Sequence, residues 1–429
     1  MFLSLRFLQI IRLFFLNPLL RLFMLRRVRF ERKNLTEHGE VHEKSACALF
    51  EISSQGEWEQ VSPLVFEILA RGESVDLLYA SPSVEHEMQV TQERYPNQLR
   101  TKRLELLTDG RAIAILNWSS APFVFLCRYD FYPELLLLKK ERKLILLNAT
   151  LKNKSFLSSL CLYRPLIKLF DLVVWSSALD AQRAREIGLA NHPNQMIGDL
   201  RPLTILERQK NATQHLTDLG LLELKDIFER MNRDQNILLG SAWESDFVYL
   251  STSVAFNQLL RAGSLRLWIA PHQLGAGAAK YWGELMQEHI GEDVRVAIID
   301  PTGPGLDRQE IEQAQIIINL TPRILCESYV YFDKVIVGGG FERSAHSISE
   351  PYYSGAFIGV GPRTHRSTEY DEVLSVEPGK IVRFDTLADL QHFLARRLPK
   401  SISPCQDRGE KLIKLRNELC SLAMSTPRS

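Results

Sequence analysis

The chain has 429 residues, of which 45% are hydrophobic and 24% charged, a composition that supplies two globular domain cores and argues against disorder. Lysine plus arginine number 52 and aspartate plus glutamate 51, so the net charge of +1 gives no overall field that would attract nucleic acid. The six cysteines are scattered, without a C-x-x-C pair or a zinc-finger spacing, which favours reduced thiols and argues against a metal site.

The first 36 residues combine leucine, phenylalanine and isoleucine with arginine. The longest uncharged stretch, Leu13 to Leu20, is too short for a membrane-spanning helix. We therefore expect residues 1–36 to form an anchoring helix, kinked at Pro18, that lies in the membrane interface with its arginines at anionic headgroups. The positive-inside tendency places the protein on the cytoplasmic face. A core or dimer helix and a single tilted span are the alternatives.

From Ser45 onward, short aliphatic runs alternate with longer amphipathic stretches, as in βαβ units. The runs form two series, each about the length of one doubly wound domain, and predict two parallel-sheet domains. The predicted strands of the first series are Ala46–Ile52, Val75–Ala80, Ala112–Leu116, Phe123–Arg128, Lys143–Asn148 and Leu172–Trp175. Those of the second series are Asn236–Gly240, Leu265–Ile269, Val294–Ile299, Ile316–Asn319, Lys334–Val337 and Ala356–Val360. The clearest helices are Val61–Arg71, Leu179–Ile187, Asp246–Leu260, Ala278–Ile290 and Ile324–Tyr331.

These patterns divide the chain into five segments. After the anchoring segment 1–36 come a Rossmann-like N-terminal domain at 37–205, a polar linker region at 206–235, a Rossmann-like C-terminal domain at 236–385 and a helical tail at 386–429.

Ligands of open α/β sheets bind beyond the carboxyl ends of the strands, so residues that follow strands are the first candidates. Glu57 follows the first strand at a glycine-containing turn, and is either a general base or a stabilising charge in a first helical turn. Asp130 follows the fourth strand and is a site residue or a helix cap. Arg201, at the end of the first domain, either neutralises a leaving phosphate or lies on the surface.

The second half has further polar residues after its strands. The first strand leads into Gly240-Ser241-Ala-Trp-Glu244, and the second ends at Pro271-His272. The glycine turn Val337–Gly340 would let the backbone approach a nucleotide, and it is followed by Ser344-Ala-His346-Ser-Ile-Ser-Glu350-Pro351. Glu350 is a ribose ligand or a helix-start charge. The chain has no P-loop, serine-hydrolase or zincin motif.

Taken in order, these pieces resemble the Kdo transferase family, which adds 3-deoxy-D-manno-octulosonic acid (Kdo) to a lipid A precursor. The family's Ser-Val-Gly-Glu turn is similar to Ser54-Gln55-Gly56-Glu57, and its Gly-Asn-Leu-Lys is similar to Gly198-Asp199-Leu200-Arg201. The other collinear matches are residues 128–134 for Glu-Thr-Glu-Leu-Trp-Pro-Asn, 147–152 for Val-Asn-Ala-Arg-Leu-Ser, 170–173 for Phe-Asp-Leu-Val, 337–339 for Val-Gly-Gly and 347–351 for Asn-Pro-Leu-Glu-Pro.

The resemblance implies an inverting, metal-independent glycosyltransferase of the GT-B fold, with acceptor domain 37–205 and donor domain 236–385 facing a central cleft. Glu57 would be the general base, while Asp130 and Arg201 would stabilise the transition state. The donor would be CMP-Kdo, and no cofactor is implied. The donor-binding residues implied by the resemblance are Pro271, His272, Thr321, Pro322, Arg323, Ser347, Ile348, Ser349 and Glu350.

The chain departs from the family on the donor side. Pro-Arg-His-Pro appears as Ala270-Pro271-His272-Gln273, without the arginine, and Met-Gly-Glu appears as Thr321-Pro322-Arg323. Arg323 is a hypothetical replacement for the missing positive charge. The expected partners are the lipid A precursor, the nucleotide sugar and the inner-membrane surface, with no nucleic acid and no specific protein. The alternatives are a GT-B enzyme that uses another nucleotide sugar on a lipid acceptor, and a non-catalytic scaffold of envelope biosynthesis.

Overall fold

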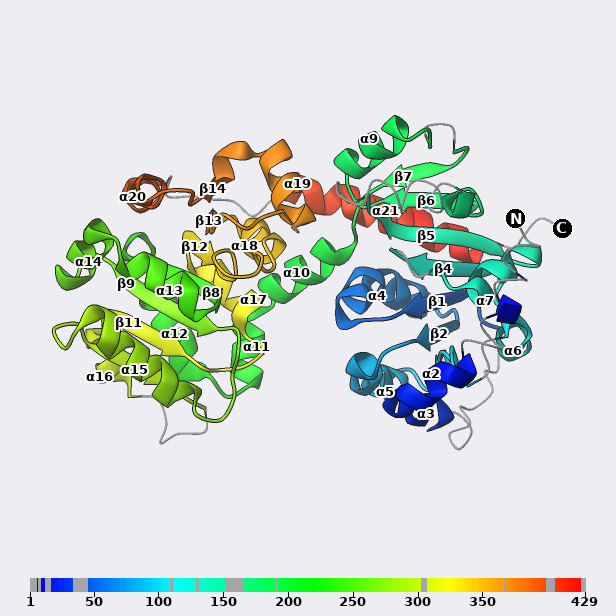
Figure 1. The fold of residues 1–429 in the computed structure, drawn as a ribbon, viewed down its shortest axis with the longest axis horizontal. Coiled ribbons are helices and arrows are strands. Elements are labelled where there is room, and N and C mark those ends of the chain that lie inside the picture. Colours follow the sequence, from blue (N-terminus) through cyan, green and yellow to red (C-terminus); the bar gives the residue numbers. More distant parts are fainter. Residues whose placement is uncertain are drawn as a thin grey trace. The chain divides into compact units, whose positions relative to one another are not determined.

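The computed structural model describes residues 6, 9–11, 17–33, 45–108, 111–128, 131–151, 165–189, 192–301, 307–365, 367–398 and 406–425. The chain forms two compact units. We call them the N-terminal domain, Met1–Thr204 with Glu410–Ser429, and the C-terminal domain, Ile205–Gly409. Each domain contains a seven-stranded sheet with helices packed on it (Figure 1). All strand pairs in both sheets are parallel, which confirms the predicted α/β class with two doubly wound domains.

The sheet of the N-terminal domain has the order β3-β2-β1-β4-β5-β6-β7. The direction in which the chain adds strands reverses between β1 and β4, and such switch points are where open sheets bind ligands. Alternate residues face opposite sides, so Phe50 stacks on Phe125 in one core while Leu49 and Val124 lie in the other. The strands are β1 (Ala48–Ile52), β2 (Val75–Tyr79), β3 (Leu99–Arg103), β4 (Phe123–Cys127), β5 (Lys143–Ala149), β6 (Leu172–Trp175) and β7 (Gln195–Ile197).

Helices cover both faces of this sheet. Helix α4 (Gln55–Ala70) and the carboxyl-terminal helix α21 (Gln406–Met424) pack on one face, and α6 (Ala112–Trp118), α7 (Pro133–Leu136) and α9 (Ala178–Glu186) pack on the other. Helix α21 passes close to Gly198, where a Cβ atom would lie 2.5 Å from Leu415 Cδ2 and would displace that side chain. The remaining helices are α2 (Asn17–Phe23), α3 (Leu25–Arg32), α5 (Glu85–Arg94) and the start of α10 (Arg201–Lys210).

The C-terminal domain repeats the architecture with the strand order β10-β11-β9-β8-β12-β13-β14. Its switch point lies between β8 and β12. Leu238 and Trp268 lie in the core on one face, and Leu239 and Leu267 in the core on the other. The strands are β8 (Asn236–Ala242), β9 (Arg266–Pro271), β10 (Val296–Ile299), β11 (Ile316–Asn319), β12 (Lys334–Val337), β13 (Phe357–Val360) and β14 (Ile381–Arg383).

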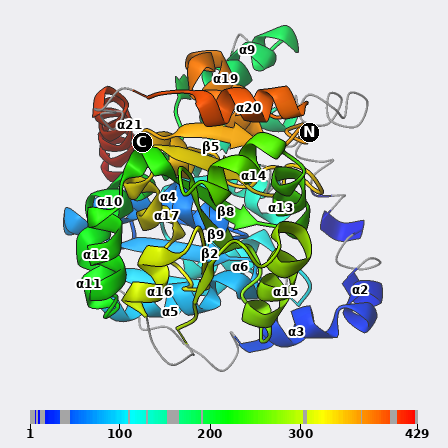
Figure 2. The same cartoon turned by 90° about the vertical axis from the view of Figure 1, so that its left-hand side faces the viewer.

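Helices α11 (Ala212–Asp218) and α12 (Leu222–Arg230) run along one side of this domain, seen at the left of Figure 2. They bury Leu216, Leu224 and Phe228 in the core, so the polar stretch expected to be a linker is part of the C-terminal domain. The other helices are α13 (Glu244–Ser251), α14 (Val254–Arg261), α15 (Ala278–Ile290), α16 (Arg308–Gln313), α17 (Leu325–Ser328), α18 (Ser349–Tyr353), α19 (Thr368–Val376) and α20 (Leu387–Ala395).

Two element predictions were wrong. The run 112–116, expected as a strand, is helix α6, in which Ile115 is buried and Ile113 exposed. A short alanine-rich apolar run fits either structure, and local sequence does not decide between them. The predicted helix 246–260 is two helices, because Ser253 caps a new helix by accepting a hydrogen bond from the Phe256 amide.

The predicted anchor contains α2 and α3, and residues 1–5, 7–8, 12–16 and 34–36 of it lie outside the described residues. Helix α2 begins at Asn17, so Pro18 lies in its first turn, where proline is tolerated. Helix α3 is fixed to the N-terminal domain by Glu31, whose carboxylate accepts hydrogen bonds of 2.9 Å from the amides of Leu107 and Thr108. None of the described helices is long and apolar enough to cross a membrane.

Candidate functional site

Glu57 lies in the first turn of α4, directly after β1, and is only 6% exposed. Ser54 is the N-cap, and its hydroxyl accepts a hydrogen bond from the Glu57 amide. The carboxylate reaches back to Ser53, where Oε2 accepts hydrogen bonds from the amide at 2.6 Å and the hydroxyl at 2.7 Å. This reciprocal arrangement resembles a capping box and fixes the carboxylate at the end of the strand. Among the described residues, no hydrogen bond to Glu57 Oε1 is formed.

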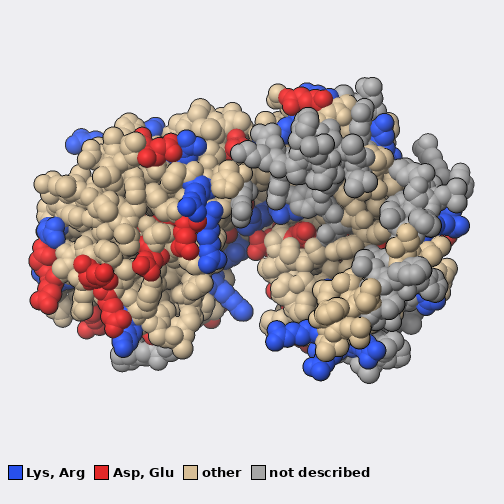
Figure 3. All heavy atoms as spheres, in the orientation of Figure 1, with Lys and Arg blue, Asp and Glu red and all other residues tan. Residues whose placement is uncertain are grey.

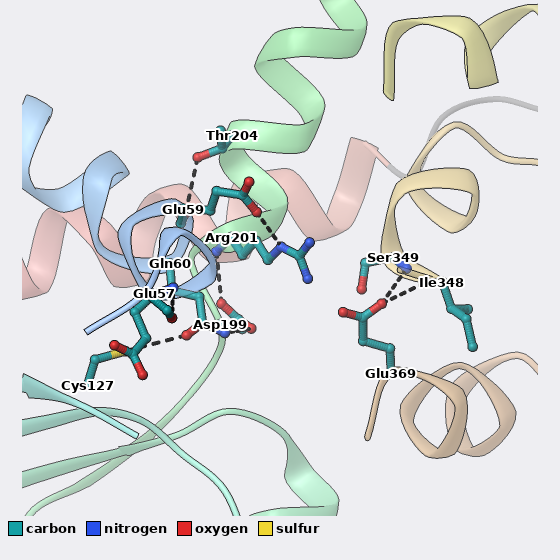
Figure 4. A network of polar contacts seen from close by, with 11 residues as sticks. Glu57, Glu59, Gln60, Cys127, Asp199, Arg201, Thr204, Ile348, Ser349 and Glu369 are labelled. Carbon is teal, nitrogen blue, oxygen red and sulfur yellow. Dashed lines mark hydrogen bonds and ion pairs between the residues drawn. The ribbon is translucent and has the colours of Figure 1, made fainter. Parts of the chain in front are cut away.

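A chain of hydrogen bonds continues from the next turn of α4 (Figure 4). The Cys127 thiol donates to Gln60 Oε1 at 3.4 Å, and Gln60 Nε2 donates to Asp199 Oδ2 at 3.4 Å. Cys127 is fully buried at the end of β4, and burial raises the pKa of its thiol well above the usual value. The carboxylate of Glu57 raises that pKa further and the charge of Arg128 opposes it, so the thiol is not a nucleophile near neutral pH.

Arg201 is the first residue of α10 and is mostly buried. Its amide donates to Asp199 Oδ1 at 2.9 Å, and its Nε donates to Glu59 Oε2 at 3.1 Å. Thr204 Oγ1 also donates to the backbone oxygen of Glu59, so two contacts attach α10 to α4. These contacts place Arg201 beside the turn that carries Glu57, as Figure 4 shows. Asp130, the third predicted catalytic residue, lies outside the described residues.

In the C-terminal domain, buried Asp246 joins the ends of β8 and β12. Its Oδ2 accepts hydrogen bonds from the amides of Trp243 at 2.9 Å and Gly339 at 2.8 Å. Burial raises the pKa of Asp246 to about 6, although backbone hydrogen bonds oppose the shift. A Cβ atom on Gly338 would lie 2.3 Å from the Ser241 carbonyl oxygen, and one on Gly340 would lie 2.6 Å from the Gly361 nitrogen. Internal packing therefore requires glycines of this turn whether or not a nucleotide approaches it.

Three rings stack at the switch point of the C-terminal domain. The ring centroids of His272 and His346 are 4.2 Å apart, and those of Trp243 and His272 are 4.9 Å apart. The Trp243 indole donates to His346 Nε2 at 2.8 Å. Burial, aided by the charges of His272 and Arg343, lowers the pKa of His346 to about 4, so this imidazole is neutral at physiological pH.

Arg343 supplies a positive charge to this stack. Its guanidinium carbon lies 4.1 Å from the centroid of Trp243, within cation–π range, and the side chain is well exposed. The switch point therefore presents aromatic faces, imidazole nitrogens and a cation, the groups that would suit a nucleotide phosphate and base.

The other predicted donor-side residues have mixed environments. Ile348 is fully buried in the core, and its amide and that of Ser349 donate to Glu369 Oε2 at 2.6 and 2.8 Å (Figure 4). An internal carboxylate thus already uses these helix-start amides. The Glu350 carbonyl accepts a hydrogen bond from Gln209 at 2.7 Å.

The loop after β11 carries Thr321, Pro322 and Arg323. Arg323 is exposed and has a left-handed backbone, with φ of 65°. Its carbonyl accepts from Arg208, which also forms a bidentate ion pair of 2.8 and 2.9 Å with buried Glu327. The described residues contain no cluster of three or more metal-ligating side chains.

A family model described as 3-deoxy-D-manno-octulosonic-acid transferase matches residues 26–203. The chain carries the N-terminal domain of the Kdo transferase family. The match agrees with the family resemblance of the sequence for this part of the chain, and it supports a glycosyltransferase with the GT-B fold.

Solved structures resemble this chain in fold. UDP-GlcNAc 2-epimerase from Methanocaldococcus jannaschii is 12% identical with a TM-score of 0.58, covering 86% of this chain and 99% of that one. The C-terminal CMP-Kdo binding domain of WaaA from Acinetobacter baumannii is 15% identical with a TM-score of 0.32, covering 52% of this chain and 100% of that one. The epimerase likeness shows the two-domain fold alone. No curated protein matches the sequence.

Within each domain, the structure brings some of the predicted site residues together. Glu57 and Arg201 belong to one polar network at the carboxyl edge of the N-terminal sheet. His272 belongs to the stack in the C-terminal domain, whereas Pro271 is buried at the end of β9 and Ile348 lies in the core. The predicted site omitted Trp243, Arg343 and His346. Two of them were visible as polar or aromatic residues after strands, but their contact depends on the pairing of β8 with β12.

Proposed function

We propose that this glycosyltransferase transfers Kdo from CMP-Kdo to a lipid A precursor at the cytoplasmic face of the inner membrane, with inversion and without a metal or cofactor. The observation that carries the proposal is the buried carboxylate of Glu57, held at the end of β1 by Ser53 within the family-matched domain. The positions of Glu57 and Arg201 support the same assignment, since both belong to motifs shared with the family.

In the proposed reaction, Glu57 Oε1 takes the proton of an acceptor hydroxyl while Ser53 holds Oε2. The hydroxyl oxygen forms a bond to the anomeric carbon of the sugar. The bond from that carbon to the CMP phosphate oxygen breaks, and its electron pair leaves with CMP. A monophosphate leaving group is favoured by positive charge and hydrogen-bond donors, the role proposed for Arg201 and for the stack in the C-terminal domain.

The donor phosphate needs a cation, and the family's arginine is absent from Ala270–Gln273. Two arginines are available as replacements. Arg323 was proposed from the sequence, and Arg343 is favoured by its contact with Trp243 in the ring stack. We expect Arg343→Ala to weaken CMP binding at least about tenfold, the effect of losing a charge-assisted hydrogen bond. CMP affinity is measured by calorimetric titration, and Arg323→Ala tests the other candidate in the same way. If a variant binds CMP as tightly as wild type, the arginine that it lacks is not part of the donor site.

The membrane association proposed here rests on an apolar patch formed by Leu19, Leu22, Phe23, Met24 and Leu25, all exposed. Phe23 is 83% exposed, and a phenylalanine ring this exposed to water is energetically unfavourable. Exposed arginines of α3 lie next to the patch, and Figure 3 shows basic side chains beside uncharged surface at the lower right. Apolar side chains with a basic border suit an anionic lipid surface.

The activity is tested with CMP-Kdo and tetra-acylated lipid A precursor, with products read by mass spectrometry. We expect Glu57→Gln to lower kcat about 100-fold or more while CMP affinity is retained. Glu93→Gln is the matched control, because Glu93 is an exposed carboxylate on α5. If Glu57→Gln turns over at the wild-type rate, Glu57 is not the base. Binding of UDP in place of CMP would favour another nucleotide sugar, and binding of neither would favour a scaffold.

The membrane assignment is tested by sedimentation with vesicles of phosphatidylethanolamine and phosphatidylglycerol. We expect Leu22→Asp with Phe23→Asp to reduce the bound fraction at least about fivefold, because charges replace side chains that would enter the acyl region. Leu222→Asp, at a leucine of the C-terminal domain that is 57% exposed, is the control. Equal binding of all three proteins would contradict the assignment.

A further inference from the structure

Two neighbouring strands of the N-terminal sheet end in residues with left-handed backbones. Arg128 follows β4 with φ of 56°, and Asn148 lies near the end of β5 with φ of 51°. The strands pair Cys127 with Leu147, and the Arg128 amide donates to the Leu147 carbonyl at 2.9 Å, so the two residues are adjacent. A left-handed backbone costs free energy for an arginine, and such strain clusters at functional sites.

Both side chains carry buried hydrogen-bond donors that lack protein acceptors in the described part of the chain. Arg128 Nε is buried without a partner, and no hydrogen bond or ion pair involves its guanidinium there. The Asn148 side chain is only 2% exposed, and its Nδ2 likewise has no acceptor. Buried polar groups are almost always satisfied, and leaving a donor unpaired is costly. Two unpaired donors on adjacent strand ends therefore call for acceptor oxygens from a ligand.

The position in the fold also points to a ligand. Arg128 follows β4 and Glu57 follows β1, and these strands flank the switch point of the sheet. Glu57 and Arg128 act on the Cys127 thiol with opposite electrostatic sign, so both charges lie within reach of one buried atom. An arginine with a free guanidinium near the proposed base is suited to hold a substrate oxyanion, which it can bind through two parallel hydrogen bonds.

We propose that Arg128 and Asn148 bind an oxyanion of the acceptor, a phosphate ester carried by the lipid precursor. The assignment of the oxyanion to the lipid precursor rests on the proposed function. The observation of two unsatisfied donors is independent of it. The carboxylate of the donor sugar is the other source of the same chemistry. Apart from Arg201, the groups proposed to bind the donor lie in the C-terminal domain, and we therefore assign the N-terminal pair to the acceptor.

The first test measures transfer kinetics with phosphorylated and dephosphorylated acceptor. We expect Arg128→Gln to raise KM for the phosphorylated acceptor at least about tenfold, and Asn148→Asp to raise it further because a carboxylate repels the anion. KM for CMP-Kdo stays unchanged. For the dephosphorylated acceptor, we expect wild-type protein to show a KM that is already high. Arg128→Gln should leave that KM unchanged. Arg185→Gln, an exposed arginine of α9, is the charge-matched control. A rise confined to the donor KM would overturn the acceptor assignment.

The second test needs no turnover and separates this inference from the proposed function. Binding of inorganic phosphate is followed by phosphorus NMR, and we expect Arg128→Gln to weaken it at least about tenfold. If that loss is seen but the wild-type protein transfers no Kdo, the proposed function fails and the pair stands. If Kdo is transferred and the variants match the wild type in KM and phosphate binding, the pair fails alone. A fall in unfolding temperature of more than about 5 °C in Arg128→Gln would assign Arg128 a structural role and overturn the inference.

Discussion

The indole Nε1 of Trp243 donates a 2.8 Å hydrogen bond to Nε2 of His346, the nitrogen that would otherwise accept a proton. The hydrogen bond requires the neutral ring with its proton on Nδ1. It acts in the same direction as burial, which lowers the pKa of His346 to about 4. The residues are 103 positions apart, so this contact also joins the loops that follow β8 and β12.

We expect Trp243→Phe to raise the pKa of His346 from about 4 toward the ordinary value of about 6.5, because the ring loses a donor that favours its neutral form. The measurement is an NMR titration of the His346 ring protons. Trp118→Phe, in the other domain, serves as the control. An unchanged His346 titration in Trp243→Phe would show that the indole does not hold this nitrogen.

The lowered pKa of His346 also determines whether this residue makes the folded protein more or less stable as pH changes. Between about pH 4 and 6.5 the unfolded chain binds more protons at this residue than the folded chain. The contribution of His346 to stability is therefore complete above about pH 6.5 and declines as pH falls toward 4, by about 2 kcal/mol.

Asp246 has the opposite dependence, because burial raises its pKa to about 6 from the usual 3.8. The folded state binds more protons than the unfolded state between these values, so this residue's contribution is complete below about pH 4 and is lost as pH rises to about 6. Asp246→Asn should remove that slope. At pH 5 the folded protein holds this carboxyl mostly protonated, so the asparagine oxygen replaces it as acceptor for the Trp243 and Gly339 amides at little cost, and the variant gains stability relative to wild type as pH rises toward 7. Urea unfolding at several pH values provides the measurement. A variant that keeps the wild-type dependence of stability on pH would show that another group is responsible for it.

The fold was predictable where strands are buried on both faces. Such strands form continuous apolar runs, as in Phe123–Cys127, and the sequence indicated most of them. The edge strand Leu99–Arg103 was missed because three of its five residues are basic; Arg100 pairs with buried Asp76 of the neighbouring strand. Charged residues protect sheet edges, so an edge strand does not show the apolar pattern of a central one.

For the candidate site, the sequence predicted single residues that follow strands but not the contacts between residues of neighbouring strands. Glu57 was identified because it follows a strand, which is a local property. The pairing of Arg128 with Asn148, and of Trp243 with His346, depends on which strands are neighbours in the sheets. Strand order is set by tertiary packing rather than by local propensity. Local patterns therefore identified separate residues but not these pairs.

Two glycines near the candidate site should respond differently to alanine. Gly56, in the first turn of α4, has open space around its Cβ position, so Gly56→Ala should preserve or raise stability by about 0.5–1 kcal/mol. Gly338→Ala should destabilise by about 1–3 kcal/mol, because the methyl group meets the Ser241 carbonyl. Urea unfolding compares the two. If Gly56→Ala also loses transfer activity, a substrate uses that open space, whereas an unfolded Gly56→Ala would contradict the helical assignment.

The final prediction concerns the attachment of α3. Glu31 is fully buried and accepts hydrogen bonds from the Leu107 and Thr108 amides, the Thr108 hydroxyl at 3.0 Å and Arg27 Nε at 2.7 Å. Glu31→Ala removes the acceptor that these donors share and should destabilise the attachment by at least about 2 kcal/mol.

Hydrogen exchange measures this effect locally. In Glu31→Ala, the amides of α3 and of Leu107 and Thr108 should exchange at least about 30-fold faster, while those of β4 remain protected. Glu93→Ala, which removes an exposed carboxylate, is the control. Because α3 attaches the apolar patch to the domain, the patch should also become mobile relative to the sheet. Unchanged exchange in α3 would mean that Phe30, packed edge-on against Tyr79, is sufficient to hold the helix.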